Sequence, residues 1–141
     1  VIVNRDNQLL VEDELMQLQN LRQAAVEFLD NGGGVGEEAC DYCQGPRDPN
    51  SSDNPVKAII SLVNDRKTEY RTYISVQNEL VAAYNQLRNR EAQRLYGMDF
   101  LEMEQKYNDP NFRGDKVTLK ERIDIVQSMY PQKLSEAEPK S

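Results

Sequence analysis

The amino-acid sequence predicts an all-α protein, a long-helix hairpin or elongated helical bundle with a long Gly/Pro-rich loop and a C-terminal pair of short helices. Apolar residues recur at helical spacings over most of the chain, and no segment shows sustained strand alternation. Only 38% of the 141 residues are hydrophobic. That fraction is low for a compact globule but sufficient for elongated helices that each bury one stripe.

The N-terminal third is expected to contain an arm and one helix. Residues 1–8 are short and polar, and we interpret them as an N-terminal arm able to add a strand to a neighbour. The first helix is predicted over residues 9–30, where apolar side chains are spaced by three, four and seven positions. Acidic residues 12–14 favour a helix N-terminus, and Gly32 provides a left-handed stop.

Residues 31–54 are predicted to form a long flexible loop that contains Cys40 and Cys43. The two cysteines have half the ligands of a structural zinc site, and the chain has no histidine to complete it. A zinc site shared across a dimer, a redox pair and a disulfide within the loop remain as alternatives. We favour reduced, structurally quiet cysteines in a tether, so the sequence predicts no cofactor and no metal site. Such a tether would let the first helix pack on its own chain or on a neighbour.

The longest predicted helix covers residues 55–96. Asn54 and Pro55 are a favourable helix start, and no Gly or Pro follows until Gly97. A helix of this length would be about 60 Å long. Its heptads form an imperfect coiled-coil seam with polar interruptions, so the wide apolar face suits packing against two or three helices. That face is the predicted partner interface and consists of Ile59, Leu62, Val63, Tyr70, Tyr73, Val76, Leu80, Tyr84 and Leu87.

Two short helices are predicted at the C-terminal end, over residues 99–108 and 118–130. Each begins with a capping-box pattern, Asp99 with Glu102 and Thr118 with Glu121. Pro131 ends the second helix, and residues 131–141 are expected to be a polar tail. We therefore place a single helical domain at residues 9–130.

The residue types exclude most familiar enzyme designs. With no histidine, the chain cannot build a Ser-His-Asp or Cys-His nucleophile or a histidine-ligated metal centre. It also lacks a phosphate-binding GxxxxGK[ST] loop and a GxGxxG turn. No pattern marks a catalytic pair among its 24 acidic residues. We predict no catalytic residues and a non-enzymatic protein.

The charge pattern argues against nucleic acid and membranes as partners. The formal net charge of −7 opposes binding to both polyanionic surfaces, and no apolar run has the length of a membrane span. We expect a location in the cytoplasm or in an intracellularly assembled particle. Two local basic patches are interpreted as solvated helix positions paired with Glu69, Glu79 and Glu91; they consist of Arg66, Lys67 and Arg71, and of Arg88, Arg90 and Arg94.

The predicted function follows from the length of the helix at 55–96. Because a rod of about 60 Å offers more apolar face than the chain can cover, we expect a helical interaction or assembly protein. It would form a homo-oligomer or dock as a protein subunit into a larger assembly such as a virion or scaffold. Two alternatives are an acidic inhibitor that imitates nucleic acid, and a zinc- or redox-linked oligomerisation switch built on Cys40 and Cys43.

Overall fold

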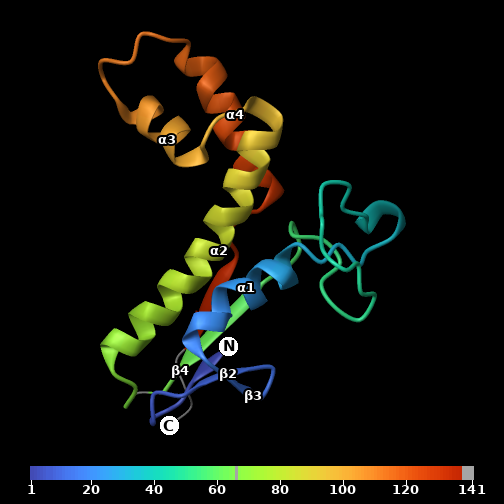
Figure 1. Cartoon of the computed structure of the whole chain (residues 1–141), viewed down its shortest axis with the longest axis vertical. Helices are drawn as coiled ribbons and strands as arrows, with labels where there is room; N and C mark the ends of the chain where they lie inside the picture. Colours follow the sequence, from blue (N-terminus) through green and yellow to red (C-terminus); the bar gives the residue numbers. More distant parts are fainter. Residues whose placement is uncertain (66, 138–141) are drawn as a thin grey trace.

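The computed structural model describes residues 1–65 and 67–137 and shows a mixed α/β fold, so the all-α prediction was wrong (Figure 1). Four α-helices accompany a five-stranded sheet with the strand order β3-β2-β1-β4-β5. The strands are β1 (Ile2–Val3), β2 (Leu9–Val11), β3 (Glu14–Met16), β4 (Ile60–Asn64) and β5 (Leu134–Ala137). The helices are α1 (Leu18–Leu29), α2 (Tyr70–Tyr96), α3 (Phe100–Asn108) and α4 (Lys116–Met129), with a short 3-10 helix, η1, at Gly36–Glu38.

A β-hairpin occupies the first part of the helix predicted at residues 9–30. Strands β2 and β3 pair antiparallel, with Val11 opposite Glu14. The two turn residues, Glu12 and Asp13, have φ values of 52° and 67°, as in the type I′ turn that matches the twist of hairpin strands. The helix prediction failed here because both faces of the hairpin carry apolar residues, which hides strand alternation. The helix itself, α1, begins only at Leu18.

Strand β4 interrupts the long helix predicted at residues 55–96. Asn54 does cap a turn, since its Oδ1 accepts a hydrogen bond from the Val56 backbone nitrogen at 2.9 Å. The chain leaves that turn and enters the sheet, where β4 pairs parallel with both β1 and β5. Ile60 and Leu62 are buried against the helices. A strand of five residues is too short for its pattern to stand out from helical spacing.

The connection from β4 to α2 turns without a glycine or proline. The Thr68 hydroxyl donates to the backbone oxygens of Val3 and Asn4 at 3.1 and 2.8 Å. The Glu69 backbone nitrogen donates to Asn7 Oδ1 at 2.9 Å. These contacts with the segment around β1 redirect the chain, so α2 has 27 residues and a length of about 40 Å. It ends, as predicted, at Gly97, whose φ of 63° is left-handed.

The first residues of the chain and the last described ones both belong to the sheet. The predicted N-terminal arm is β1, which lies between β2 and β4. The predicted polar tail contains the edge strand β5, and the Ile60 backbone nitrogen donates to Lys133 O beside it at 3.0 Å. The rest of that predicted tail, residues 138–141, lies outside the described residues. Helices α3 and α4 occur where helices were predicted, and α4 starts at Lys116 because Asp115, not Thr118, caps it.

The apolar face of α2 is covered by its own chain, which contradicts the coiled-coil packing expected from the sequence. Its first half packs with α1 and one face of the sheet, and its last turns pack with α3 and α4. The larger core includes Val3, Leu9, Leu21, Ala25, Leu29, Ile60, Leu62, Val76, Leu80, Tyr84, Leu87 and Tyr130. The smaller core consists of Ala92, Phe100, Met103, Leu119, Ile123 and Val126.

A matched pair of leucine substitutions tests this assignment of the core. We expect Leu80→Ala to lower the free energy of unfolding by about 3 kcal/mol, because Leu80 is fully buried and truncation leaves a cavity. Leu101 on α3 is 62% exposed, so Leu101→Ala is expected to cost less than about 0.5 kcal/mol. Urea unfolding of both variants measures the difference. Equal losses would contradict the placement of α2 in the core.

Candidate functional site: the open face of the sheet

The residues predicted as a partner interface do not form one exposed face. Ile59 and Tyr70 are exposed at 59% and 76%, and Val63 and Tyr73 are half-buried. The others lie in the larger core and are Leu62, Val76, Leu80, Tyr84 and Leu87. Leu62 belongs to β4, and in this fold α2 cannot present the other four core residues to a partner without separating from α1 and the sheet.

The exposed apolar surface of interest is the sheet face opposite α1 and α2, here called the open face. Side chains alternate along a strand, so Val3, Leu9 and Leu62 face the helices and their neighbours face away. In the described ranges, no helix packs on this opposite side. The strand register aligns one apolar residue from each of four adjacent strands: Leu15, Leu10, Ile2 and Val63.

The open face is also free of charged strand residues. Only two residues of the described strands are charged, Glu14 and Glu136, and both lie on the helix side. Glu136 accepts a hydrogen bond from the Gln77 side chain of α2 at 2.8 Å, and Glu14 lines a cavity beside α1. Ser61 and Ser135, which pair between β4 and β5, add small polar groups to the open face. An acidic chain therefore has one surface that a second acidic chain can approach without direct repulsion.

The loop between α1 and β4 is not a free tether with reduced cysteines, which corrects both expectations. Cys40 and Cys43 form a disulfide and are 1% and 4% exposed. The Arg47 guanidinium donates to the backbone oxygens of Cys40 and Cys43 at 3.0 and 2.7 Å. While bonded to each other, the two sulfurs are not thiolate ligands for zinc. In the described part of the chain no cluster of three or more Cys, Asp or Glu is arranged to hold a metal ion.

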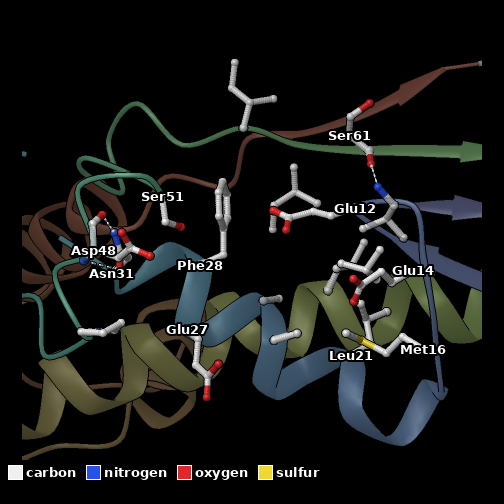
Figure 2. Close-up of a pocket in the computed structure, with 18 residues that line it drawn as sticks. Glu12, Glu14, Met16, Leu21, Glu27, Phe28, Asn31, Asp48, Ser51 and Ser61 are labelled. Atoms are coloured by element: carbon white, nitrogen blue, oxygen red, sulfur yellow. Dashed lines mark hydrogen bonds between the residues drawn. The ribbon is translucent and has the colours of Figure 1, made fainter. Parts of the chain in front are cut away.

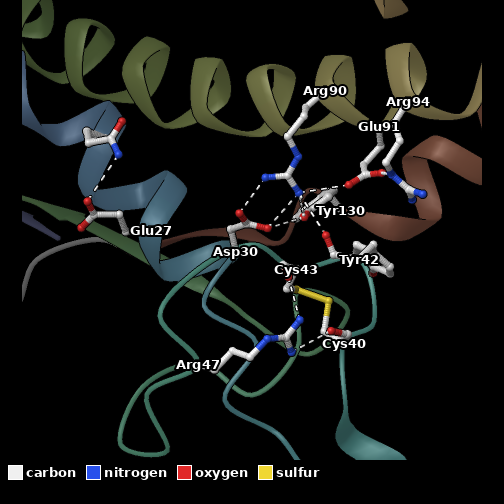
Figure 3. Close-up of polar contacts among 11 residues, drawn as sticks. Glu27, Asp30, Cys40, Tyr42, Cys43, Arg47, Arg90, Glu91, Arg94 and Tyr130 are labelled. Carbon is white, nitrogen blue, oxygen red and sulfur yellow. Dashed lines mark hydrogen bonds and ion pairs between the residues drawn. A yellow bond between two sulfur atoms is a disulfide. The ribbon is translucent and has the colours of Figure 1, made fainter. Parts of the chain in front are cut away.

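Tyr42, within the disulfide, attaches this loop to a polar cluster around Asp30 and Arg90 (Figure 3). Arg90 donates to both oxygens of Asp30, at 2.7 and 3.0 Å, and the Tyr130 hydroxyl donates to Asp30 Oδ1 at 2.7 Å. The Tyr42 hydroxyl donates to Met129 O at 2.6 Å. The cluster therefore joins the end of α1, the disulfide loop, α2 and the end of α4.

The charges in this cluster compensate one another. Glu91 is fully buried and accepts hydrogen bonds from Arg90 and Arg94. Arg90 and Arg94 pair with Glu91 as predicted, but Glu91 is buried and Arg90 also pairs with buried Asp30, so Arg90 is not the solvated helix position that was predicted. Glu79 pairs instead with Arg22 of α1 at 2.8 Å. Arg66, of the first patch, lies outside the described residues. The Arg90 guanidinium donates its hydrogen bonds to groups within the protein, including Asp30 and Glu91.

Burial and hydrogen bonding shift the acid-base properties of the cluster. Burial disfavours an ionised Asp30, but hydrogen bonds from Arg90 and Tyr130 outweigh it and hold the pKa of Asp30 below its ordinary value. Burial and the neighbouring Asp30 carboxylate raise the pKa of Tyr130. Burial, followed by the charges of Glu91 and Asp30, raises the pKa of Tyr42 to about 12. Both tyrosines are therefore neutral donors at neutral pH, which suits a structural role.

Sequence reasoning placed Ile2 in an arm able to add a strand to a neighbour, but it missed Leu10 and Leu15 as residues of an exposed sheet face. A local signal was present, because the apolar triplet Leu9–Val11 and the apolar pair at residues 15 and 16 lie on either side of a two-residue turn at Glu12 and Asp13. No comparable signal marked the pairing of Asp30 with Tyr130, which are 100 positions apart.

Comparisons with known protein families, with curated proteins and with solved structures found no match to this chain. Among the helices described, none has both the length and the apolar character that crossing a bilayer requires. The support for the open face as a candidate interface therefore comes from its geometry and its surface chemistry.

Asp30→Asn tests the polar cluster through the pH dependence of stability. Because the folded-state pKa of Asp30 is below its ordinary value of 3.8, the ionised group stabilises the fold at neutral pH. That contribution is lost as the pH falls below this value and through the folded-state pKa. We expect Asp30→Asn to cost about 3 kcal/mol at neutral pH and to flatten the fall in stability between about pH 5 and pH 2. Denaturant unfolding across this range measures both effects.

The matched control for this prediction is Asp41→Asn, which changes an exposed carboxylate in the same loop. We expect its stability to follow that of the unaltered protein at every pH. If the free energy of unfolding changed with pH in the same way for the unaltered protein and for Asp30→Asn, the assigned role of Asp30 would be contradicted.

The disulfide is expected to stabilise the fold only modestly. It links residues three positions apart, and closing so short a loop removes little entropy from the unfolded chain, worth about 2 kcal/mol. The double variant Cys40→Ser/Cys43→Ser should therefore remain folded at neutral pH, with that loss in the free energy of unfolding by urea. Complete unfolding of the variant would show that the loop depends on the disulfide far more than chain entropy predicts.

Proposed function

We propose that this protein is a non-enzymatic assembly protein that associates with a second copy of itself through the open face of the sheet. The observation that carries the proposal is the apolar row formed by Ile2, Leu10, Leu15 and Val63 across four adjacent strands. Leu15 is 67% exposed and Ile2 is 39% exposed. Large apolar side chains aligned on an uncharged face are a common basis for protein association.

A second copy is the partner that this surface fits best. A flat, uncharged apolar row can pair with itself about a two-fold axis, in which each chain supplies the same patch. A basic partner would gain nothing from a face without carboxylates, and an acidic patch would be expected on a protein that imitates nucleic acid. Self-association retains the assembly function expected from the sequence but moves the interface from α2 to the sheet.

The size of the open face predicts weak association. Four strands at their usual spacing span about 20 Å with their side chains, and the short strands extend over about 15 Å, so the patch covers about 300 Å² per chain. Stable interfaces bury about 800 Å² per partner. The contact is therefore expected to act when chains are concentrated or held together in a larger assembly, where effective concentration is high.

The Cys40–Cys43 disulfide supports an oxidising location in preference to the cytoplasm. Disulfides persist mainly in oxidising compartments and are reduced in the cytosol of most organisms. Both sulfurs are buried, and Arg47 holds the backbone on either side of them. The assembly proposed here would then form where this loop stays oxidised.

Sedimentation analysis at increasing protein concentration tests self-association. We expect concentration-dependent dimerisation, and we expect Leu15→Lys to abolish it because the substitution places a charge at the most exposed side chain of the apolar row. The control, Leu101→Lys, alters a side chain of α3 with a similar exposure of 62% and should dimerise normally. A monomer at every concentration, or equal loss in both variants, would refute the proposal.

The same sedimentation measurement distinguishes the redox and zinc alternatives. Dimerisation through the open face should be unchanged by a chelator. Moderate reductant is also expected to leave it unchanged, because the sheet carries the contact and the cysteines belong to the loop after α1. A dimer that forms only with zinc, or only in one redox state, would instead identify Cys40 and Cys43 as an oligomerisation switch.

A further inference from the structure

A groove lies between the β2–β3 hairpin, α1 and the first residues of β4, on the helix side of the sheet (Figure 2). Its cavity has a volume of about 410 Å³, within the range of sites that bind small molecules or a few side chains. A second cavity of about 400 Å³ shares Glu12, Phe28, Ser51 and Ile59 with it and extends the groove along residues 50–54. Together the two cavities have the elongated form that a peptide segment requires.

The groove has an apolar floor. Figure 2 shows Phe28 projecting from α1 toward the strands, with Met16 and Leu21 farther along the same side. Val11 and Ile59 complete the floor, and Ile59 is 59% exposed. Ile59 was one of the residues predicted to form a partner interface, and it remains accessible in this fold. Burial of these side chains by a ligand would be favourable by about 25 cal/mol for each Å² removed from water.

Two positive groups lie along the groove: the Val1 ammonium, which donates to Ser61 O at 2.9 Å, and Lys57 of the second cavity, which pairs with Glu38. The other charged groups that line the first cavity are all acidic side chains. They are Glu12, Glu14, Glu27 and Asp48, although Figure 2 shows Glu27 extending from α1 away from the strands, and no Lys or Arg is among the residues that line the cavity. The chain as a whole has 17 basic residues against 24 acidic ones, so a lining without Lys or Arg differs from the average composition. In the described part of the protein, none of the four forms an ion pair with a Lys or Arg.

The spacing of these carboxylates disfavours a metal ion as the ligand. A bound divalent cation requires several oxygen ligands within about 2.6 Å of one point. Over the ranges that the structure describes, no three acidic residues approach that arrangement. Negative charge spread along an apolar floor instead complements positive charge spread along an apolar ligand.

We infer that this groove binds a segment of a partner protein in which apolar side chains alternate with lysine or arginine. The apolar side chains would occupy the floor formed by Phe28, Met16 and Ile59, while the basic groups reach Glu12, Glu14 and Asp48 on the rim. This binding does not depend on self-association through the open face, because the groove lies on the opposite side of the sheet.

Binding of a short synthetic peptide that alternates lysine and leucine, labelled with a fluorophore, tests the inference by fluorescence anisotropy at low salt. We expect saturable binding to the full chain that weakens as the salt concentration rises. In Glu12→Gln/Glu14→Gln each neutralised carboxylate is expected to weaken binding about two- to fivefold. Peptides that alternate glutamate with leucine, or lysine with serine, should bind much more weakly because each lacks one of the two features.

The matched control is Glu102→Gln/Glu121→Gln, which removes the same charge from exposed positions on α3 and α4. Charges separated by more than about 10 Å are largely screened at 0.1 M salt, so this variant should bind the peptide as the unaltered protein does. Backbone NMR shifts caused by the peptide should centre on Ala24, Phe28 and Ile59. Ile2→Lys, which alters the open face, should leave the affinity unchanged.

Four outcomes of the peptide and variant comparisons would overturn the inference, and a fifth concerns protein concentration. The four are an absence of saturable binding, equal affinity for the three peptides, equal weakening in the two double variants, and shifts centred on the open face. Peptide binding that declines as the protein concentration rises would also overturn it, because a second copy would then be filling the groove. Leu15→Lys keeps the two proposals distinguishable. If this variant no longer dimerises but binds the peptide normally, the groove and the open face act independently, and a failure of one does not imply a failure of the other.

Discussion

The fold depends on a strand of only two residues in the middle of the sheet. Ile2 and Val3 of β1 pair antiparallel with the hairpin strand β2 and parallel with β4, so they join the N-terminal hairpin to the rest of the molecule. Thr68 reinforces this junction by donating to Val3 O and Asn4 O. Without β1, the apolar row of the open face would be divided and the hairpin wall of the acidic groove would have no attachment to β4.

A second constraint acts at the other end of α1, where charged groups are buried together. Removing Asp30, Arg90 and Glu91 from water is costly, and the cost is offset only when each charge has a hydrogen-bonded partner of opposite sign. The partners come from α1, α2 and the end of α4, with the Tyr42 backbone adding an acceptor from the disulfide loop. The cluster therefore requires a specific arrangement of four segments, which apolar packing alone would not impose.

Sequence patterns predicted the elements whose signals are local and failed where long-range contacts decide the structure. Gly97 and Asp99 correctly marked the end of α2 and the start of α3, because a left-handed residue and a capping carboxylate act within one turn. The segments at Leu9–Val11 and Ile60–Asn64 were taken for helix because short strands with apolar residues on both faces mimic helical spacing. Thr68 ends the strand region through bonds to residues 64 and 65 positions away, which no local pattern reveals.

The two candidate surfaces also illustrate why burial must be known before an interface can be chosen. Leu62 and Leu80 are as apolar as Leu15, but the first two fill the core and only Leu15 reaches solvent. Ile60 lines the groove at the start of β4 on the helix side, whereas Val63, farther along the same strand, belongs to the open face. Because the two surfaces lie on opposite sides of one sheet, binding at either leaves the other accessible. A chain that dimerises would then present two acidic grooves, and a partner with two basic segments would gain affinity from the higher effective concentration of the second site.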